Sequence, residues 1–181
     1  MSDRLALTRR LVAAALFAAL TAVCSQLQIP LPAIPINLAL FAVYLSGALL
    51  GARWGALAMI AYALLGAIGV PVFVGFVSGP AALFGRTGGY ILGYVFAAGI
   101  VGLLSRRWGR TFAPLCAAMA LGTGACYLFG TAWFMVLTGS TLAASLSACV
   151  LPFLPGDAVK IALAAALALR LQRPMRAMGM G

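Results

Sequence analysis

Long apolar stretches, separated by short polar breaks or by breaks rich in glycine and proline, make up most of the chain. The apolar segments are six in number and cover residues 10–28, 36–52, 55–70, 89–105, 112–137 and 156–171. Each approaches or exceeds the roughly 20 residues that a helix needs to cross the hydrocarbon core of a bilayer. The pattern predicts an all-α polytopic membrane protein, a bundle of six transmembrane helices that forms one domain over residues 1–181.

The composition supports this class. Hydrophobic residues make up 65% of the chain and charged residues 8%, and the mean hydropathy is +1.13. Too little polar surface remains to cover a soluble globule of this size. The first apolar run extends from Leu11 to about Ile29, which is long enough to span, so we interpret it as the first helix and not as a cleaved signal peptide.

The charge distribution predicts the topology. The net charge of +10 comes from arginines that gather at the ends of the apolar segments. If the N-terminus is cytoplasmic, every arginine except Arg86 falls on the cytoplasmic side, as the positive-inside rule requires. These residues are Arg4, Arg9, Arg10, Arg53, Arg106, Arg107, Arg110, Arg170, Arg173 and Arg176. We therefore expect both termini to be cytoplasmic, and nucleic acid is a poor candidate partner.

Few residues could support catalysis. The chain has no histidine and no glutamate, and its two acids are Asp3 and Asp157, so metal hydrolysis and paired-carboxylate chemistry lack their components. The one lysine follows Val159, which excludes a G-x-x-x-x-G-K-[ST] nucleotide loop. The cysteines, at positions 24, 116, 126 and 149, show no C-x-x-C spacing. We expect no enzyme activity, no metal and no cofactor.

The sequence LPGDAVK at residues 154–160 holds the only acid beyond Asp3 and the only lysine. Asp157 and Lys160 are three residues apart and would share one face of a helix that starts after Leu-Pro-Gly. Ionisable groups in such segments are functional candidates by default. The structural alternative is an ion pair that satisfies itself, with Asp157 as the N-cap of the helix. The two interpretations are compatible.

Residues 66–89 are apolar but too rich in glycine and proline for one continuous helix. Such backbone is tolerated near membrane depth only where protein buries it or where it lines a cavity, so this loop is expected to border a binding site open to the outside. Phe73 would supply an apolar wall, and Arg86 could hold a carboxylate. Tyr90 is a further candidate, with an interfacial anchor as its alternative. Asn37 could face a ligand or cap the second helix.

These residues together suit a compact, amphipathic, anionic ligand, because they offer an acceptor, two cationic donors and apolar walls. In the first helix, alanines recur at four-residue spacing, as at Ala14, Ala18 and Ala22. Small residues one turn apart let another membrane helix approach closely. The alanine face could dock a partner protein or pack inside the bundle, and the sequence favours neither.

Four stretches give the chain a family resemblance. They are IPLPAIPINLALFAVYLSGALLG at 29–51, YALLGAIGVPVF at 62–73, GRTGGYILGY at 85–94 and PFLPGDAVKIALA at 152–164. Together they resemble the BioY family, the biotin-binding S components of energy-coupling factor (ECF) transporters. The resemblance extends over nearly the whole chain.

The resemblance implies high-affinity capture and uptake of biotin across the cytoplasmic membrane of a bacterium by a multi-pass protein. It implies that Asp157 and Lys160 contact the ureido ring, that Tyr90 lies in the family's Gly-Gly-Tyr motif, and that the alanine face docks on the coupling component. The implied partners are biotin, that ECF transmembrane coupling component and two ABC-type ATPases, with self-association left open. A passive facilitator or channel for another solute, or an S component for a different vitamin, remains as the alternative.

Overall fold

The computed structural model describes residues 2–31 and 33–177, with side chains described for residues 4–31 and 33–175. Regular structure in this part of the chain is helical except for one small ribbon. The elements are α1 (Ser2–Gln26), β1 (Gln28–Ile29), β2 (Ile36–Asn37), α2 (Ala39–Ala67), the 3₁₀ turn η1 (Val74–Phe76), α3 (Pro80–Leu83), α4 (Gly88–Trp108), α5 (Phe112–Thr138), α6 (Leu142–Cys149) and α7 (Leu154–Ala177).

Several helices are long and apolar enough to cross a bilayer. In the described residues, four helices qualify singly, over Arg4–Gln26, Ala39–Ala67, Gly88–Trp108 and Phe112–Thr138. A fifth candidate is the pair of Leu142–Cys149 and Leu154–Met175, which is bent by 51°. Large apolar side chains such as Leu16, Leu64 and Leu128 are exposed, as contact with lipid requires. The prediction of a helical, multi-pass membrane protein is confirmed at this level.

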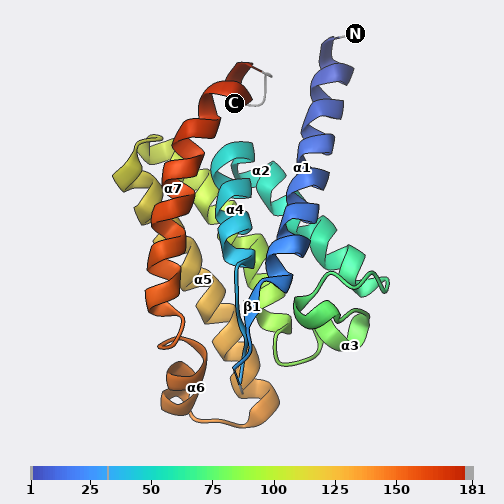
Figure 1. Cartoon of the computed structure of the whole chain (residues 1–181), viewed down its shortest axis with the longest axis vertical. Helices are drawn as coiled ribbons and strands as arrows, with labels where there is room; N and C mark the ends of the chain where they lie inside the picture. Colours follow the sequence, from blue (N-terminus) through green and yellow to red (C-terminus); the bar gives the residue numbers. More distant parts are fainter. Residues whose placement is uncertain (1, 32, 178–181) are drawn as a thin grey trace.

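Helix α2 contains two of the expected spans in one element. We expected separate helices over 36–52 and 55–70, and α2 covers both from Ala39 to Ala67, with a kink at the non-helical residue Gly51, where φ is 80° and ψ is 176°. A positive φ favours glycine, so the bend falls at this residue. The two halves of α2 take different directions on either side of it (Figure 1).

The helices pack closely around α4, which lies against both α2 and α5. A Cβ added at Gly102 would lie 2.2 Å from the backbone nitrogen of Ala52, and one added at Gly93 would lie 2.9 Å from the Cα of Cys126. The absence of a side chain at these two positions therefore sets how near α2 and α5 approach α4.

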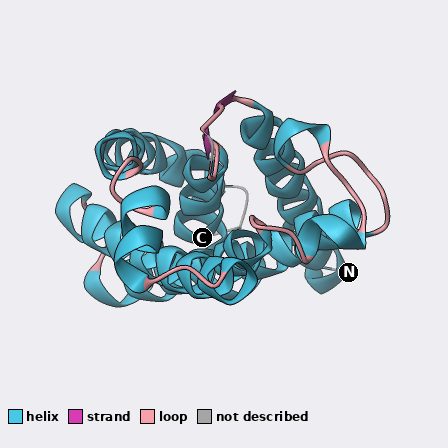
Figure 2. Ribbon diagram, turned by 90° about the horizontal axis from the view of Figure 1, so that it is seen from below, coloured by secondary structure: helices cyan, strands magenta, loops and turns pink. Residues whose placement is uncertain are grey.

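The two ends of the bundle differ. Both chain termini lie at one end, whereas β1, α3 and α6 lie at the other (Figure 1). The β strands form an antiparallel ribbon in which Gln28 pairs with Asn37 and Ile29 with Ile36, and this ribbon projects at the edge of the bundle (Figure 2). The proline-stiffened segment between the strands includes Pro32, which lies outside the described residues, as does the side chain of Arg176.

Two connections contain short helices. Between α2 and α4 the chain forms η1 and α3 and no continuous helix, as the glycine and proline pattern predicted. After α5, the short helix α6 lies in a segment for which the sequence analysis predicted no helix. The side chain of Thr141 accepts a hydrogen bond from the backbone N–H of Ala144 at 3.4 Å, which caps this helix at its start.

Candidate functional site

Asp157 and Lys160 lie on the first two turns of α7, deep in the protein. Their exposed fractions are 2% and 7%, and Lys160 Nζ donates to Asp157 Oδ1 at 2.8 Å. Asp157 is not the N-cap of its helix, because α7 begins three residues earlier and the Asp157 N–H already donates to the carbonyl of Phe153. Pro155 fits the first helical turn, where no N–H is needed, so Leu-Pro-Gly opens the helix and does not precede it.

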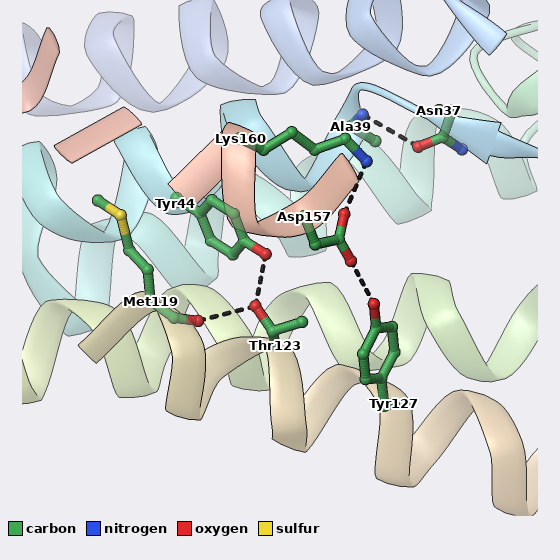
Figure 3. A network of polar contacts seen from close by, with 8 residues as sticks. All are labelled: Asn37, Ala39, Tyr44, Met119, Thr123, Tyr127, Asp157 and Lys160. Carbon is green, nitrogen blue, oxygen red and sulfur yellow. Dashed lines mark hydrogen bonds and ion pairs between the residues drawn. The ribbon is translucent and has the colours of Figure 1, made fainter. Parts of the chain in front are cut away.

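Tyr127 on α5 completes the environment of the carboxylate. Its hydroxyl donates to Asp157 Oδ2, so each carboxylate oxygen has one partner from the protein (Figure 3). A carboxylate has about four acceptor positions and a lysine ammonium has three donors. Both charged groups therefore retain hydrogen-bonding capacity beyond the contacts that hold them together.

A second polar contact lies beside the first (Figure 3). Tyr44 Oη and Thr123 Oγ1 are 2.5 Å apart, and Thr123 also donates to the carbonyl of Met119 at 2.9 Å. These groups connect α2 to α5 by hydrogen bonds that buried polar atoms require. The polar atoms of α2, α5 and α7 thus converge in an otherwise apolar interior.

A small cavity of about 40 Å³ borders this polar centre. Its walls come from β2, α2, the loop before η1, α4, α5 and α7. The lining residues are Ile34, Pro35, Asn37, Leu40, Tyr62, Phe73, Val74, Thr87, Tyr90, Ile91, Tyr94, Tyr127, Phe153 and Lys160. Four residues singled out in the sequence, Asn37, Phe73, Tyr90 and Lys160, therefore meet at one place. The volume suits a few water molecules, since one needs roughly 10–15 Å³.

A larger cavity of about 390 Å³ lies under the loop that carries η1 and α3. It shares Phe73, Val74 and Thr87 with the small cavity, so the loop separates the two spaces. The start of this loop is tied to α1, because Gln26 Nε2 donates to the carbonyl of Phe73 at 2.9 Å and Ser25 Oγ donates to that of Val72 at 2.6 Å. The predicted role of the loop as a cavity wall agrees with this arrangement.

Asn37 and Tyr90 each make a structural contact as well as lining the cavity. The side-chain oxygen of Asn37 accepts from the N–H of Ala39, the first residue of α2, at 3.0 Å. The N-cap residue of α2 is Leu38, so Asn37 lies one residue before the cap that was weighed as its alternative. The hydroxyl of Tyr90 donates to the carbonyl of Cys149 at 3.1 Å and so connects α4 to α6. Tyr90 is 7% exposed, so it is not an interfacial anchor of the usual kind.

Arg86 and the alanine face stand apart from this centre. Arg86 is exposed in the turn between α3 and α4. Ala14 and Ala18 are 7% and 1% exposed and belong to the buried core, in a helix that packs along α2. Of the two alternatives for the alanine face, docking a partner or packing inside the bundle, Ala14 and Ala18 therefore take the second. Ala22 is half-buried. The exposed pair at four-residue spacing is Ala15 and Ala19.

The comparison with known sequences identifies the family. The BioY family model matches residues 1–177. The chain belongs to the BioY family. The resemblance described from the sequence is thereby confirmed.

Relatives of known name agree with this membership. The chain is 37% identical over 165 residues to the biotin transporter BioY of Thermotoga maritima, covering 91% of this chain and 96% of the relative. It is 40% identical over 158 residues to the probable biotin transporter BioY of Pyrococcus horikoshii, covering 87% and 93%. As a member of the BioY family, the chain is a transport protein and not an enzyme.

A solved structure shows the same fold. The crystal structure of the S-component for biotin from an ECF-type ABC transporter matches with a TM-score of 0.85 at 26% sequence identity, over 92% of each chain. Within the described residues of this BioY chain, no group of three histidine, cysteine or acidic side chains could hold a metal ion.

Several residues of the centre were missed in the sequence, among them Tyr127 and Tyr62. Tyr127 lies on α5, thirty positions before its partner Asp157, and Tyr62 lies on α2, where its ring meets that of Phe73 edge to face with centroids 5.5 Å apart. Spacing along one helix carries no information on contacts between helices. The only signal available was the presence of a hydroxyl on a segment that is otherwise apolar.

Proposed function

We propose that this chain captures biotin from outside the cell and acts as the substrate-binding S component of an ECF transporter. The observation that carries the proposal is the buried Asp157–Lys160 pair beside a cavity, in a chain of the BioY family. A membrane protein that buries one acid and one lysine together has to compensate for their desolvation. A ligand that uses both groups gives that burial a function.

The ureido ring of biotin complements this pair. Its N–H groups are donors that the carboxylate of Asp157 can accept, and its carbonyl can accept from the ammonium of Lys160. Charge-assisted hydrogen bonds of this kind are about twice as strong as neutral ones. Because both groups have unused hydrogen-bonding positions, they can bind the ring while still paired with each other. Tyr127 positions the carboxylate for this role.

The small cavity has to widen to admit such a ligand. Its volume of about 40 Å³ is well below the roughly 300–1,000 Å³ of sites for small molecules. The loop with η1 and α3 separates it from the cavity of about 390 Å³, so an outward shift of Phe73 and Val74 would join the two spaces. Phe73, Tyr62 and Tyr90 would then contact the apolar part of the ligand.

Arg86 is proposed to bind the ligand's carboxylate at the mouth of the widened site. It is exposed, it is the one arginine at this end, and its neighbours Gly85 and Thr87 line the larger cavity. A guanidinium is well suited to bind a carboxylate through two hydrogen bonds. Replacing Arg86 by glutamine should weaken the binding of biotin but not that of biotin methyl ester, which has no free carboxylate.

The proposed topology keeps six spans, with the two halves of α2 counted separately, and both termini in the cytoplasm of a bacterium. The clustering of arginines at the end that holds both termini supports it. ATP-driven uptake then needs other chains, namely a transmembrane coupling component and two ATPases. On α1 we place the docking surface at the exposed residues around Ala15 and Ala19, and not at the buried Ala14 and Ala18.

Equilibrium binding of radiolabelled biotin to the purified chain tests the proposal. The wild type should retain one biotin per chain, and Asp157→Asn or Lys160→Ala should weaken binding by more than about tenfold, or about 1.4 kcal/mol. Arg107→Gln, which removes an exposed charge at the other end, is the matched control and should bind as the wild type does.

The outcomes separate the function from the site. If the wild type retained no biotin, biotin capture would be contradicted. If Asp157→Asn and Lys160→Ala both bound biotin as tightly as the wild type, only the assignment of these two residues to the site would be contradicted. Uptake in cells with and without the coupling proteins tests the S-component role. Ligand flux in liposomes without any ATPase would instead support a passive facilitator, which the family membership does not favour.

A further inference from the structure

A third cavity, of about 440 Å³, lies at the end of the bundle that holds both termini. It is formed between α1, the Gly51 bend of α2 and the last turns of α4. Its lining includes four arginines, Arg10, Arg53, Arg106 and Arg110, which come from three helices and the turn after α4. The biotin site proposed above makes no use of this cavity.

Among the described residues, the charged side chains that line this cavity are all arginines. Asp157 is the one carboxylate whose side chain the structure describes, and it is engaged with Lys160 and Tyr127 in the other site. Like charges brought together repel one another unless an anion or water stands between them. Arg10, Arg53 and Arg106 therefore form a site of positive potential suited to an anion.

The backbone fixes the shape of the cavity. The bend at Gly51, where φ is 80° and ψ is 176°, changes the direction of α2 beside Arg53. Gly102 lets α4 approach this point, because its Cβ would lie 2.2 Å from the nitrogen of Ala52. The arginines of α2 and α4 are thereby brought to the same cavity.

The lining also indicates where the anion comes from. Leu103 lines the cavity and is 58% exposed, so the cavity offers an exposed apolar side chain beside its arginines. Trp54 lines it as well, and tryptophan is enriched at the level of the headgroups. A soluble anion would not need the apolar contact, whereas a lipid offers a headgroup and an acyl chain side by side.

We propose that this cavity binds the phosphate headgroup of an anionic phospholipid, with its acyl chains along Leu103. Guanidinium groups match phosphate oxygens in a bidentate manner, and basic pockets between membrane helices are suited to such headgroups. The positive-inside rule explains why arginines occur at this end but not why four converge on one cavity. Arg107, Arg170 and Arg173 are described arginines near the same end that do not line it.

The test uses two variants with the same change in charge. Arg53→Gln/Arg106→Gln removes two arginines of the cavity, and Arg107→Gln/Arg173→Gln removes two exposed arginines of the same end outside it. Purified proteins in a neutral detergent are mixed with micelles containing phosphatidylglycerol, and bound lipid is counted by native mass spectrometry. The wild type should bind one lipid saturably, the cavity variant about tenfold more weakly, and the control within about twofold of the wild type.

Three results would overturn the proposal. Equal losses in both double variants would indicate a diffuse surface charge. Displacement of the lipid by inorganic phosphate or glycerol phosphate at concentrations similar to its own would make a soluble anion the ligand. If the wild type binds no lipid and the cavity variant instead weakens association with the coupling component, the cavity recognises an acidic protein surface. The unfolding temperature in lipid-free detergent, expected to be alike for all three proteins, checks that they are folded.

Discussion

Toward the end of the bundle with α6 and the β ribbon, Lys160 Nζ lies 2.8 Å from Asp157 Oδ1, and the hydroxyl of Tyr127 donates a hydrogen bond to Asp157 Oδ2. At the opposite end, arginines surround a cavity of about 440 Å³ with no described carboxylate among its lining residues. Both regions concentrate charge, but the first pairs opposite charges within the protein, whereas the charged side chains that line the second are arginines alone.

The difference follows from the surroundings of each region. A buried charge in an apolar interior needs a partner within the protein, since the idealised desolvation cost reaches about 20 kcal/mol per ion and several kcal/mol after relaxation. A charge at the headgroup level can be solvated by water or by anionic lipid. Charge in this fold is therefore paired within the protein where it is buried, and it is exposed to external anions where it meets the interface.

Removing one member of the buried pair should have the largest effect. Lys160→Met leaves Asp157 as an uncompensated buried charge, and the free energy of unfolding should fall by about 3–5 kcal/mol. Unfolding in detergent, followed by thermal or denaturant titration, measures this. The double variant Asp157→Asn/Lys160→Gln, which has no charge to compensate, should recover most of the stability but not the binding of biotin.

The matched control for this prediction is Arg107→Met, which removes an exposed charge from the other end. It should change the free energy of unfolding by no more than about 0.5 kcal/mol. If Lys160→Met and Arg107→Met proved equally mild, the two ends would not differ in their need for internal partners.

Tyr127→Phe should come next, because it removes one hydrogen bond from the charged carboxylate. Hydrogen bonds to charged groups contribute about 1.5–3 kcal/mol, so biotin affinity should fall by about tenfold or more as Asp157 loses its orientation. Tyr44→Phe is the matched change in the neighbouring contact with Thr123, and it should affect stability by about 1 kcal/mol while sparing affinity. Equal losses of affinity in both variants would mean that Tyr127 has no special role in positioning.

Gly102→Ala tests how the arginine end is built. The added Cβ would lie 2.2 Å from the nitrogen of Ala52, so α4 and the bend of α2 must separate, at a cost of about 1–3 kcal/mol. Gly99→Ala, on the same helix, meets nothing within 4 Å and should be neutral or stabilising by up to about 1 kcal/mol. Unfolding temperatures of the two variants check this, and similar values would show that close packing at Gly102 is unimportant.

Features with a local cause could be predicted from the sequence. The apolar segment at 112–137 differs from α5, Phe112–Thr138, by one residue at its end, because hydropathy and helical propensity act over the same stretch. The break between α2 and α4 followed from its glycines and prolines, which disfavour a helix whatever surrounds them. The pairing of Asp157 with Lys160 followed from their spacing on one helix.

Features decided by contacts between helices could not be predicted. The division between the expected segments 36–52 and 55–70 lies within two residues of the bend, but the sequence does not single out Gly51, since Gly47 and Gly55 remain helical beside it. The partnership of Tyr127 with Asp157 depends on how α5 and α7 pack. The alanines of α1 repeat at the same spacing on two faces, and only its rotation against α2 decides that Ala14 and Ala18 are buried while Ala15 and Ala19 are exposed.

Substitutions on the two faces of α1 separate docking from packing, and the one on the exposed face has the smallest expected effect on stability. Ala15→Leu adds volume on the exposed face, so it should change the free energy of unfolding by no more than about 0.5 kcal/mol and leave biotin binding intact. Ala18→Leu, at 1% exposure, adds the same volume inside the α1–α2 contact and should destabilise the chain by about 1–3 kcal/mol. In cells with the coupling proteins, Ala15→Leu should reduce biotin uptake, because a leucine there holds a partner helix away from α1. Undiminished uptake with Ala15→Leu would place the docking surface elsewhere on the bundle, while leaving the assignment of the biotin site untouched.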